Sequence, residues 1–230
     1  IDRNGEIKKA DYGVINVFTQ YLVDHYGKEI LIDSLPISKK GISSLEYALA
    51  KNGFEESFSQ IFTDWTIVSL LNDCLLGPKY CYLNENLKEL RIVSSLIFLP
   101  ISQDSAHFLT YVTKNWSGNW YKIIGGKGNL KVEFKGAPEV NFKVPYMVQG
   151  ADKDFSINFL ELDINQKGTL YVSDFGEEFI SLILLPSIQT KYSGFDGEEP
   201  FYQFSFSISF VEEIEEGEEE LIKKLLAQIE

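Results

Sequence analysis

The chain has 230 residues, 44% apolar and 14% aromatic, which is enough to bury one large core or two ordinary ones and excludes disorder throughout. Its formal net charge is −13, and seven of the negative charges are the glutamates of EEIEEGEEE at 212–220, so subtracting them leaves −6 for the rest. Nucleic acid and anionic membranes both favour clustered Lys and Arg, and no basic stripe stands out here, so neither is expected as a partner.

Helical spacing and helix-ending residues dominate the first ninety residues. The segment ADYGVINVFTQYLVDHYGKE predicts a helix that ends near Gly27, and KEILIDSL predicts a short second helix stopped by Pro36. GISSLEYALAK predicts a third helix. Ser57 is a suitable N-cap for a fourth, whose apolar stripe from Phe58 to Leu71 is interpreted as core.

From about residue 91 the alternation of apolar and polar residues replaces the helical period, as in LKVEFKG, GTLYVSDFG and FYQFSFSISF. About eight or nine short strands are expected, arranged as an antiparallel sandwich or jelly roll. The predicted fold class is therefore α+β in two parts: a helical subdomain at 1–88, followed by a jelly-roll-like β-sandwich at 89–211.

Residues 212–230 are expected to form an acidic linker and the start of a helix. The glutamates repel one another and have nothing apolar to bury, whereas ELIKKLLAQIE places apolar residues at helical spacing up to the last residue. We expect a longer parent protein that continues as a coiled coil and oligomerises through it. The chain also begins at Ile1 without a basic and apolar leader, which indicates a processed protein or an excised piece. The longest apolar stretch, at 92–101, is too short to span a membrane.

The two cysteines lie in NDCLLGPKYCYLN, where Gly77 and Pro78 can turn the chain back between Cys74 and Cys81. A local disulfide is the favoured interpretation, and it implies an oxidising compartment, so the protein would be secreted or at the cell surface. The alternative is two free buried thiols.

Ligands for metals are scarce in this sequence. A protein zinc site usually takes at least three His, Cys or acidic ligands, and only His25, His107 and the two cysteines are available besides surface acids. We therefore nominate no catalytic, cofactor-binding or metal-binding residue. Calcium has weak support from three Asp/Gly segments, DRNGE at 2–6, DINQKG at 163–168 and GFDGEE at 194–199; DINQKG is interpreted as a hairpin turn because Lys167 stands where an oxygen ligand should be.

The aromatic cluster NWSGNWY contains Trp116, Trp120 and Tyr121. Flat aromatic rings suit the apolar faces of sugars, so these three residues are a candidate ligand platform at a hairpin tip. The same residues could alternate in and out of a strand pair and fill the sandwich, and burial in the core is the favoured interpretation.

Several segments taken together resemble a protein family. ADYGVINVFTQYLVDHYGKE, GISSLEYALAKNGFEESFSQIFTDWTIVSLLND and KYCYLN resemble the helical region that follows the zinc-binding motif in secreted gluzincin-type metallopeptidases, of the hyicolysin-like and immune-inhibitor-A-like kind. The β-rich part resembles what often follows that region. The resemblance implies a zinc enzyme that hydrolyses peptide bonds, but its H-E-x-x-H motif would lie before Ile1. Tyr12 is the one residue here that would stabilise an oxyanion, and helix packing is its favoured role.

The leading hypothesis is a non-catalytic C-terminal portion of an exported metallopeptidase-like protein, in which zinc would be held only by residues upstream of this chain. The alternative is a cell-surface binding or adhesion module without peptidase activity. Its ligand would be a protein, a peptide or a glycan.

Overall fold

The computed structural model describes residues 9–35, 38–100, 106–152, 154–195 and 197–212, with side chains from residue 12 onward. The contacts within the chain divide it into two compact units. The first contains residues 1–92 and 192–194, and the second contains 93–191 and 195–230. The predicted acidic linker and coiled-coil helix fall outside the described residues from 213 onward.

The first unit is helical, and its helices begin and end close to the predicted positions. They are α1 (Lys9–Tyr26), α2 (Glu29–Ser34), α3 (Ile42–Lys51) and α4 (Phe58–Leu71), followed by the single 3-10 turns η1 (Cys74–Leu76), η2 (Pro78–Tyr80) and η3 (Glu85–Leu87). Ser57 caps α4 as predicted, because its hydroxyl oxygen accepts the backbone N–H of Gln60 at 3.2 Å. Asn72 ends α4 in the left-handed conformation.

The core of the helical unit forms where apolar side chains of α1, α3 and α4 are removed from water. Tyr21, Leu22, Leu49, Ile61 and Val68 are all at most 2% exposed. The first turns of α1 are different: Tyr12, Val14 and Ile15 are 56–62% exposed. Tyr12 therefore does not pack in the helical core, contrary to the interpretation favoured for it from the sequence.

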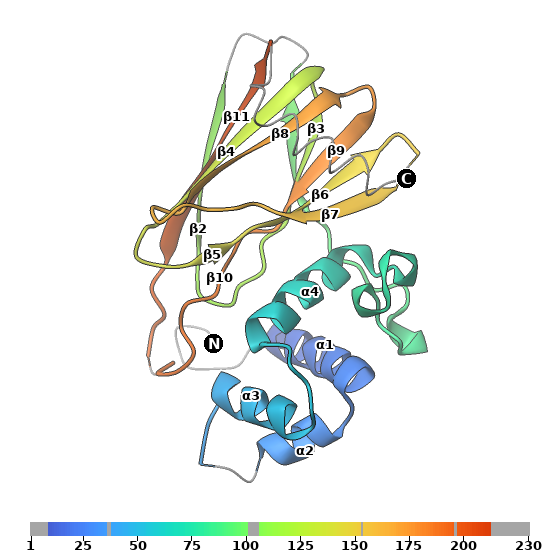
Figure 1. The fold of residues 1–230 in the computed structure, drawn as a ribbon, viewed down its shortest axis with the longest axis vertical. Helices are drawn as coiled ribbons and strands as arrows, with labels where there is room; N and C mark the ends of the chain where they lie inside the picture. The colour runs from blue at the N-terminus through green and yellow to red at the C-terminus, as the bar shows by residue number, and fades with distance from the viewer. Residues whose placement is uncertain (1–8, 36–37, 101–105, 153, 196, 213–230) are drawn as a thin grey trace. The chain divides into compact units, whose positions relative to one another are not determined.

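The second unit is a large, curled, mixed β-sheet (Figure 1). Its strands are β1 (Ser95–Leu99), β2 (His107–Thr113), β3 (Tyr121–Gly125), β4 (Gly128–Gly136), β6 (Pro145–Gly150), β7 (Phe155–Phe159), β8 (Lys167–Phe175), β9 (Phe179–Leu184) and β11 (Tyr202–Val211). Two further short strands, β5 (Phe142–Lys143) and β10 (Ser187–Ile188), pair with each other. The α+β class predicted from the sequence is confirmed at this level.

Strand pairing divides the curled sheet into two runs. One run is β1-β3-β9-β6-β7 and the other is β8-β4-β11-β2, and the single pair Phe175 and Phe179 joins β8 to β9. Most pairs are antiparallel, whereas β1 runs parallel to β3. The inward side chains of both runs belong to one hydrophobic core. It includes Ile123 and Leu184 from the first run and Val132 and Phe206 from the second, and all four are 0% exposed.

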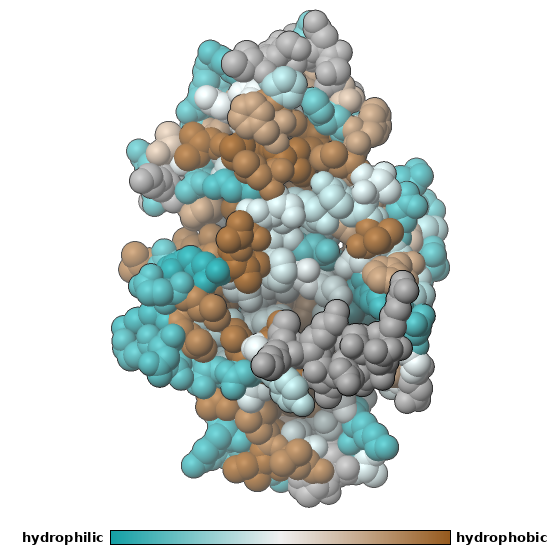
Figure 2. Space-filling model, turned by 180° about the vertical axis from the view of Figure 1, so that it is seen from behind, coloured by the Kyte–Doolittle hydropathy of each residue, from teal (hydrophilic) through white to brown (hydrophobic). Residues whose placement is uncertain are grey.

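Apolar side chains also remain at the surface. Figure 2 shows that they gather in patches on the face seen from behind rather than being scattered evenly. In the β unit, exposed examples include Leu96 and Phe98 of β1, which are 61% and 68% exposed.

No helix in the described part of the chain is long and apolar enough to cross a membrane.

Candidate functional site

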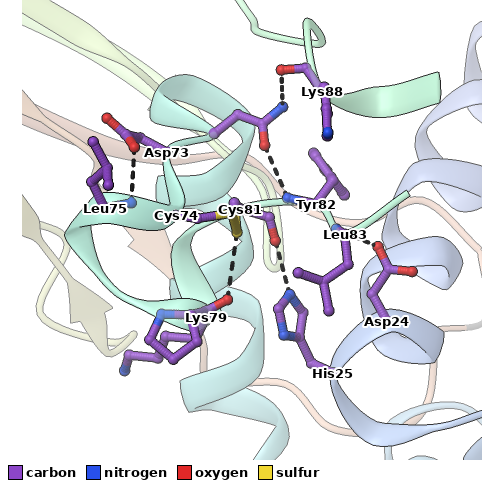
Figure 3. Close-up of a disulfide and its surroundings, with 12 residues drawn as sticks. Asp24, His25, Asp73, Cys74, Leu75, Lys79, Cys81, Tyr82, Leu83 and Lys88 are labelled. Atoms are coloured by element: carbon purple, nitrogen blue, oxygen red, sulfur yellow. Dashed lines mark hydrogen bonds between the residues drawn. A yellow bond between two sulfur atoms is a disulfide. The ribbon is translucent and has the colours of Figure 1, made fainter. Parts of the chain in front are cut away.

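The disulfide predicted from the sequence is present. Cys74 and Cys81 are bonded, with Cα atoms 4.9 Å apart, and the 3-10 turns η1 and η2 fold the segment between them (Figure 3). Cys81 is 1% exposed, whereas Cys74 lies at the surface. Leu75, the next residue, is 95% exposed. The bond therefore closes a small surface loop whose second half is anchored in the helical unit.

Polar side chains of α1 hold the end of this loop without help from the disulfide. Asp24 accepts the backbone N–H groups of Leu83 and Asn84 at 2.9 and 3.2 Å, and His25 Nε2 donates to the carbonyl oxygen of Cys81 at 2.9 Å (Figure 3). The partner of His25 lies 56 residues away in the sequence, so His25 is a cross-link between α1 and the disulfide loop.

Asn72 continues the same network at the end of α4. Its side-chain oxygen accepts the N–H of Tyr82 at 2.9 Å, and its amide nitrogen donates to the carbonyl oxygens of Leu87, Lys88 and Leu90. An Asn amide can donate and accept at once, which suits a residue that must join two segments. These contacts are structural and leave little capacity for a ligand.

Removal of the disulfide should lower stability without unfolding the protein. Closing a loop of this length restricts the unfolded chain by about 2.5 kcal/mol, and the hydrogen bonds from Asp24 and His25 should still place the loop. We expect the Cys74→Ser, Cys81→Ser double variant to lose about 2 kcal/mol in urea denaturation. Reducing the wild-type protein with a thiol should reproduce that loss. An unchanged midpoint in both experiments would contradict the prediction.

The three aromatic residues nominated as a ligand platform do not share one environment. Tyr121 is 7% exposed and belongs to the core, where its ring lies 4.3 Å from that of Tyr111 and 6.0 Å from that of Phe204. Trp116 and Trp120 are half-buried, and neither is free of other interactions. Trp116 has a left-handed backbone and donates its indole N–H to the carbonyl oxygen of Lys191. Ligand binding at Trp116 and Trp120 stays a prediction.

The segment DINQKG forms a turn, with the backbone N–H of Gln166 donating to the carbonyl oxygen of Asp163 at 2.9 Å, but it is not the predicted hairpin, because β7 before it pairs with β6 and β8 after it pairs with β4 and β9. Asp163 accepts the backbone N–H groups of Asn165 and Lys167, each at 2.8 Å, and these bonds lower the pKa of its carboxyl. DRNGE at 2–6 lies outside the described residues, as does Asp196 of GFDGEE. Among the residues that the structure describes, no group of three or more His, Cys, Asp or Glu side chains is arranged to hold a metal ion.

A surface that the sequence did not single out lies on the outer side of β2, β11, β4 and β8. Along β11 the residues Phe204, Phe206 and Ile208 point into the core, so the alternating residues point outward. The same alternation holds on the other three strands. We call this surface the lysine–serine face. Its members are Phe108, Thr110 and Val112 of β2, Gln203, Ser205, Ser207 and Ser209 of β11, Lys131, Glu133 and Lys135 of β4, and Lys167, Thr169 and Tyr171 of β8.

The strand register arranges this face in rows. One row contains Thr110, Ser205, Lys135 and Lys167, each directly opposite the next. The neighbouring row contains Phe108, Ser207, Glu133 and Thr169. Neighbouring strands lie about 4.8 Å apart, so a row of four positions spans roughly 14 Å.

The charges on the face are distributed unevenly. Lys131 pairs with Glu133 at 3.2 Å, and its ammonium lies 5.9 Å from the centre of the Tyr171 ring. Lys135 and Lys167 are both exposed, and within the described part of the chain neither forms a salt bridge. Phe108 at the edge of the face is 77% exposed, and the serines between it and the lysines are half-buried. The face thus offers hydroxyl groups, unpaired ammonium groups and an open aromatic ring on rigid strands.

Comparisons with known proteins identify no family. No protein-family model matches the chain, and no curated protein matches it. Among solved structures, the pre-peptidase C-terminal domain of a Bacillus anthracis collagenase is 6% identical at a TM-score of 0.32, covering 51% of this chain and 95% of that domain. PliG from Salmonella Typhimurium, a periplasmic inhibitor of g-type lysozyme, is 17% identical at 0.30, covering 51% and 100%. Its Aeromonas hydrophila counterpart is 11% identical at 0.32, covering 50% and 95%. At these values the similarities carry no argument about ligand or activity.

Proposed function

We propose that this chain is a non-catalytic, glycan-binding module of an exported metallopeptidase-like protein. In this proposal residues 1–88 are the helical part and residues 89–211 are a β-sandwich accessory domain. The metallopeptidase relation rests on the sequence resemblance. The disulfide supports an extracytoplasmic location, because such bonds persist mainly in oxidising compartments.

The observation that carries the binding function is the exposed ring of Phe108 beside the serine hydroxyls of β11. Phe108 is directly opposite Ser207, and Thr110 is directly opposite Ser205. Sugars combine apolar ring faces with hydroxyl groups, so a surface that binds them pairs aromatic rings with polar side chains. A rigid sheet presents these groups without the entropic cost of ordering a loop.

A printed glycan array tests the proposal with two matched variants. Phe108 and Phe159 are both exposed phenylalanines on strands, but only Phe108 belongs to the lysine–serine face. We expect the wild-type chain to be retained by a subset of glycans, Phe108→Ser to weaken that binding by about fivefold to tenfold, and Phe159→Ser to leave it unchanged. Binding to no glycan, or equal losses in both variants, would reject the proposed function.

The non-catalytic part of the proposal has its own test. Incubation of the purified chain with casein and zinc should give no cleavage, since the metallopeptidase resemblance would place the zinc-binding motif outside this chain. Zinc-dependent cleavage that a chelator abolishes would contradict this expectation.

A further inference from the structure

Two lysines lie directly opposite each other where β4 ends and β8 begins. The register pairs Lys135 with Lys167, and both side chains point outward and are exposed. Like charges at directly opposite positions of antiparallel strands destabilise the pair. The arrangement therefore has a cost in the free protein, and a negatively charged partner would remove it.

The acidic residues near this pair do not neutralise it. Glu133, on the same face, is paired with Lys131. Asp163, in the turn before β8, uses one carboxylate oxygen to accept backbone N–H groups from Asn165 and Lys167. The backbone hydrogen bond from Lys167 is the main cause of the lowered pKa of Asp163, and the positive charge of the Lys167 side chain contributes least. Two ammonium groups thus remain available on a chain whose net charge is −13.

The neighbours of the lysine pair indicate what kind of anion would fit. Ser205 is next to Lys135 in the same row, and Thr110 follows it on β2. The neighbouring row ends in the exposed Phe108. A ligand that covers these positions must present carboxylates to the lysines, hydroxyl groups to the serine and threonine, and an apolar ring face to the phenylalanine. Phe108 lies two strand spacings from Lys135 and three from Lys167, which is about 10 to 14 Å.

We propose that the lysine–serine face binds acidic polysaccharides, with uronic acid carboxylates contacting Lys135 and Lys167 and sugar rings lying across Ser205 and Ser207 toward Phe108. This inference rests on the proposed function and specifies the class of glycan. Screening limits the repulsion from the rest of the acidic chain to about 8 Å at physiological ionic strength, so contacts at the lysine pair decide the local charge preference.

The experiment measures binding of the full chain to polygalacturonic acid and to the same polymer after methyl esterification, which removes the charge and keeps the sugar. We expect the esterified polymer to bind at least about tenfold more weakly. Lys135→Gln, Lys167→Gln should reduce binding to the acidic polymer by about tenfold and flatten its dependence on salt concentration. Lys143→Gln, an exposed strand lysine outside the face, is the matched control and should bind like the wild type.

The acidic preference and the glycan-binding function can fail separately. Binding to neutral glycans that depends on Phe108 but ignores the two lysines would overturn the acidic preference and leave the glycan-binding function standing. Binding to poly-glutamate as strong as to polygalacturonate would show recognition of charge alone and overturn the polysaccharide assignment. Binding to no polysaccharide would reject both. Circular dichroism of each variant should match the wild type, because all three lysine side chains are exposed on strands.

Discussion

Replacing Phe206 by Ala should lower the free energy of unfolding of the β unit by about 4 kcal/mol. Phe206 is 0% exposed, and its ring centre lies 5.4 Å from that of Tyr121, 5.7 Å from that of Phe204 and 5.9 Å from that of Phe134. Truncation removes the buried ring and leaves a cavity among aromatic neighbours, which cannot collapse easily. Urea denaturation followed by tyrosine and tryptophan fluorescence would measure the loss.

Ser207 provides the matched control, because it is the next residue along β11 and points to the opposite side. Ser207→Ala should change the free energy of unfolding by less than about 0.5 kcal/mol, the usual range for a surface substitution. A loss at Ser207 as large as that at Phe206 would show that the outer side of β11 is packed rather than open. That result would also remove the basis for a ligand surface there.

The helices and the inward residues of the strands were predictable because the signals are local. The capping position of Ser57 is a matter of a few neighbouring residues, and α4 starts immediately after it. In FYQFSFSISF the alternation alone separates the core residues Phe204, Phe206 and Ile208 from the serines. The disulfide was also a local prediction, since the Gly77 and Pro78 turn lies between the two cysteines.

The lysine–serine face could not be predicted in the same way, because its composition depends on strand order. Lys135 and Lys167 are 32 positions apart, and Phe108 and Ser207 are separated by 99. Only the order β8-β4-β11-β2, which is not the order of the strands in the sequence, places them in adjacent rows. The role of His25 was missed for the same reason, since its carbonyl partner Cys81 comes from a distant loop.

The core and the lysine–serine face lie on opposite sides of the same strands, so substitutions can test each of them independently. Most outward residues of β4, β8 and β11 lie next to buried ones, and those of β2 lie next to half-buried ones, so the backbone that orders the core also fixes the spacing of the outward groups. The face therefore needs no loop closure before it binds, and variants at exposed positions should report on ligand contacts rather than on folding.

In the helical unit, replacing Lys79 by Met should lower the free energy of unfolding by about 3 kcal/mol at neutral pH. Asp64 is 2% exposed, and its carboxylate accepts a hydrogen bond from the Lys79 ammonium at 3.0 Å. Removing the cation leaves a buried carboxylate without its ionic partner. The expected loss is at the low end for buried pairs, because the Lys79 side chain is 43% exposed and water already screens part of the interaction.

The pH dependence identifies the cause of that loss. Burial raises the pKa of Asp64 above its usual value despite the hydrogen bond from Lys79, so folding favours the protonated carboxyl. The stability linked to this proton is fully present below the usual aspartate pKa of about 4 and is lost as the pH rises through the higher folded pKa. Without Lys79 the folded pKa should rise further. The difference in the free energy of unfolding between Lys79→Met and the wild type should therefore shrink as the pH falls from about 8 towards 4.

Lys51→Met, which removes the partner of the more exposed Asp33, is the matched control and should leave the free energy of unfolding nearly unchanged over the same pH range. A loss in Lys79→Met that is the same at every pH would assign the effect to the lost cation–π contact with the Tyr80 ring, whose centre lies 5.1 Å from the ammonium, rather than to the buried carboxylate of Asp64.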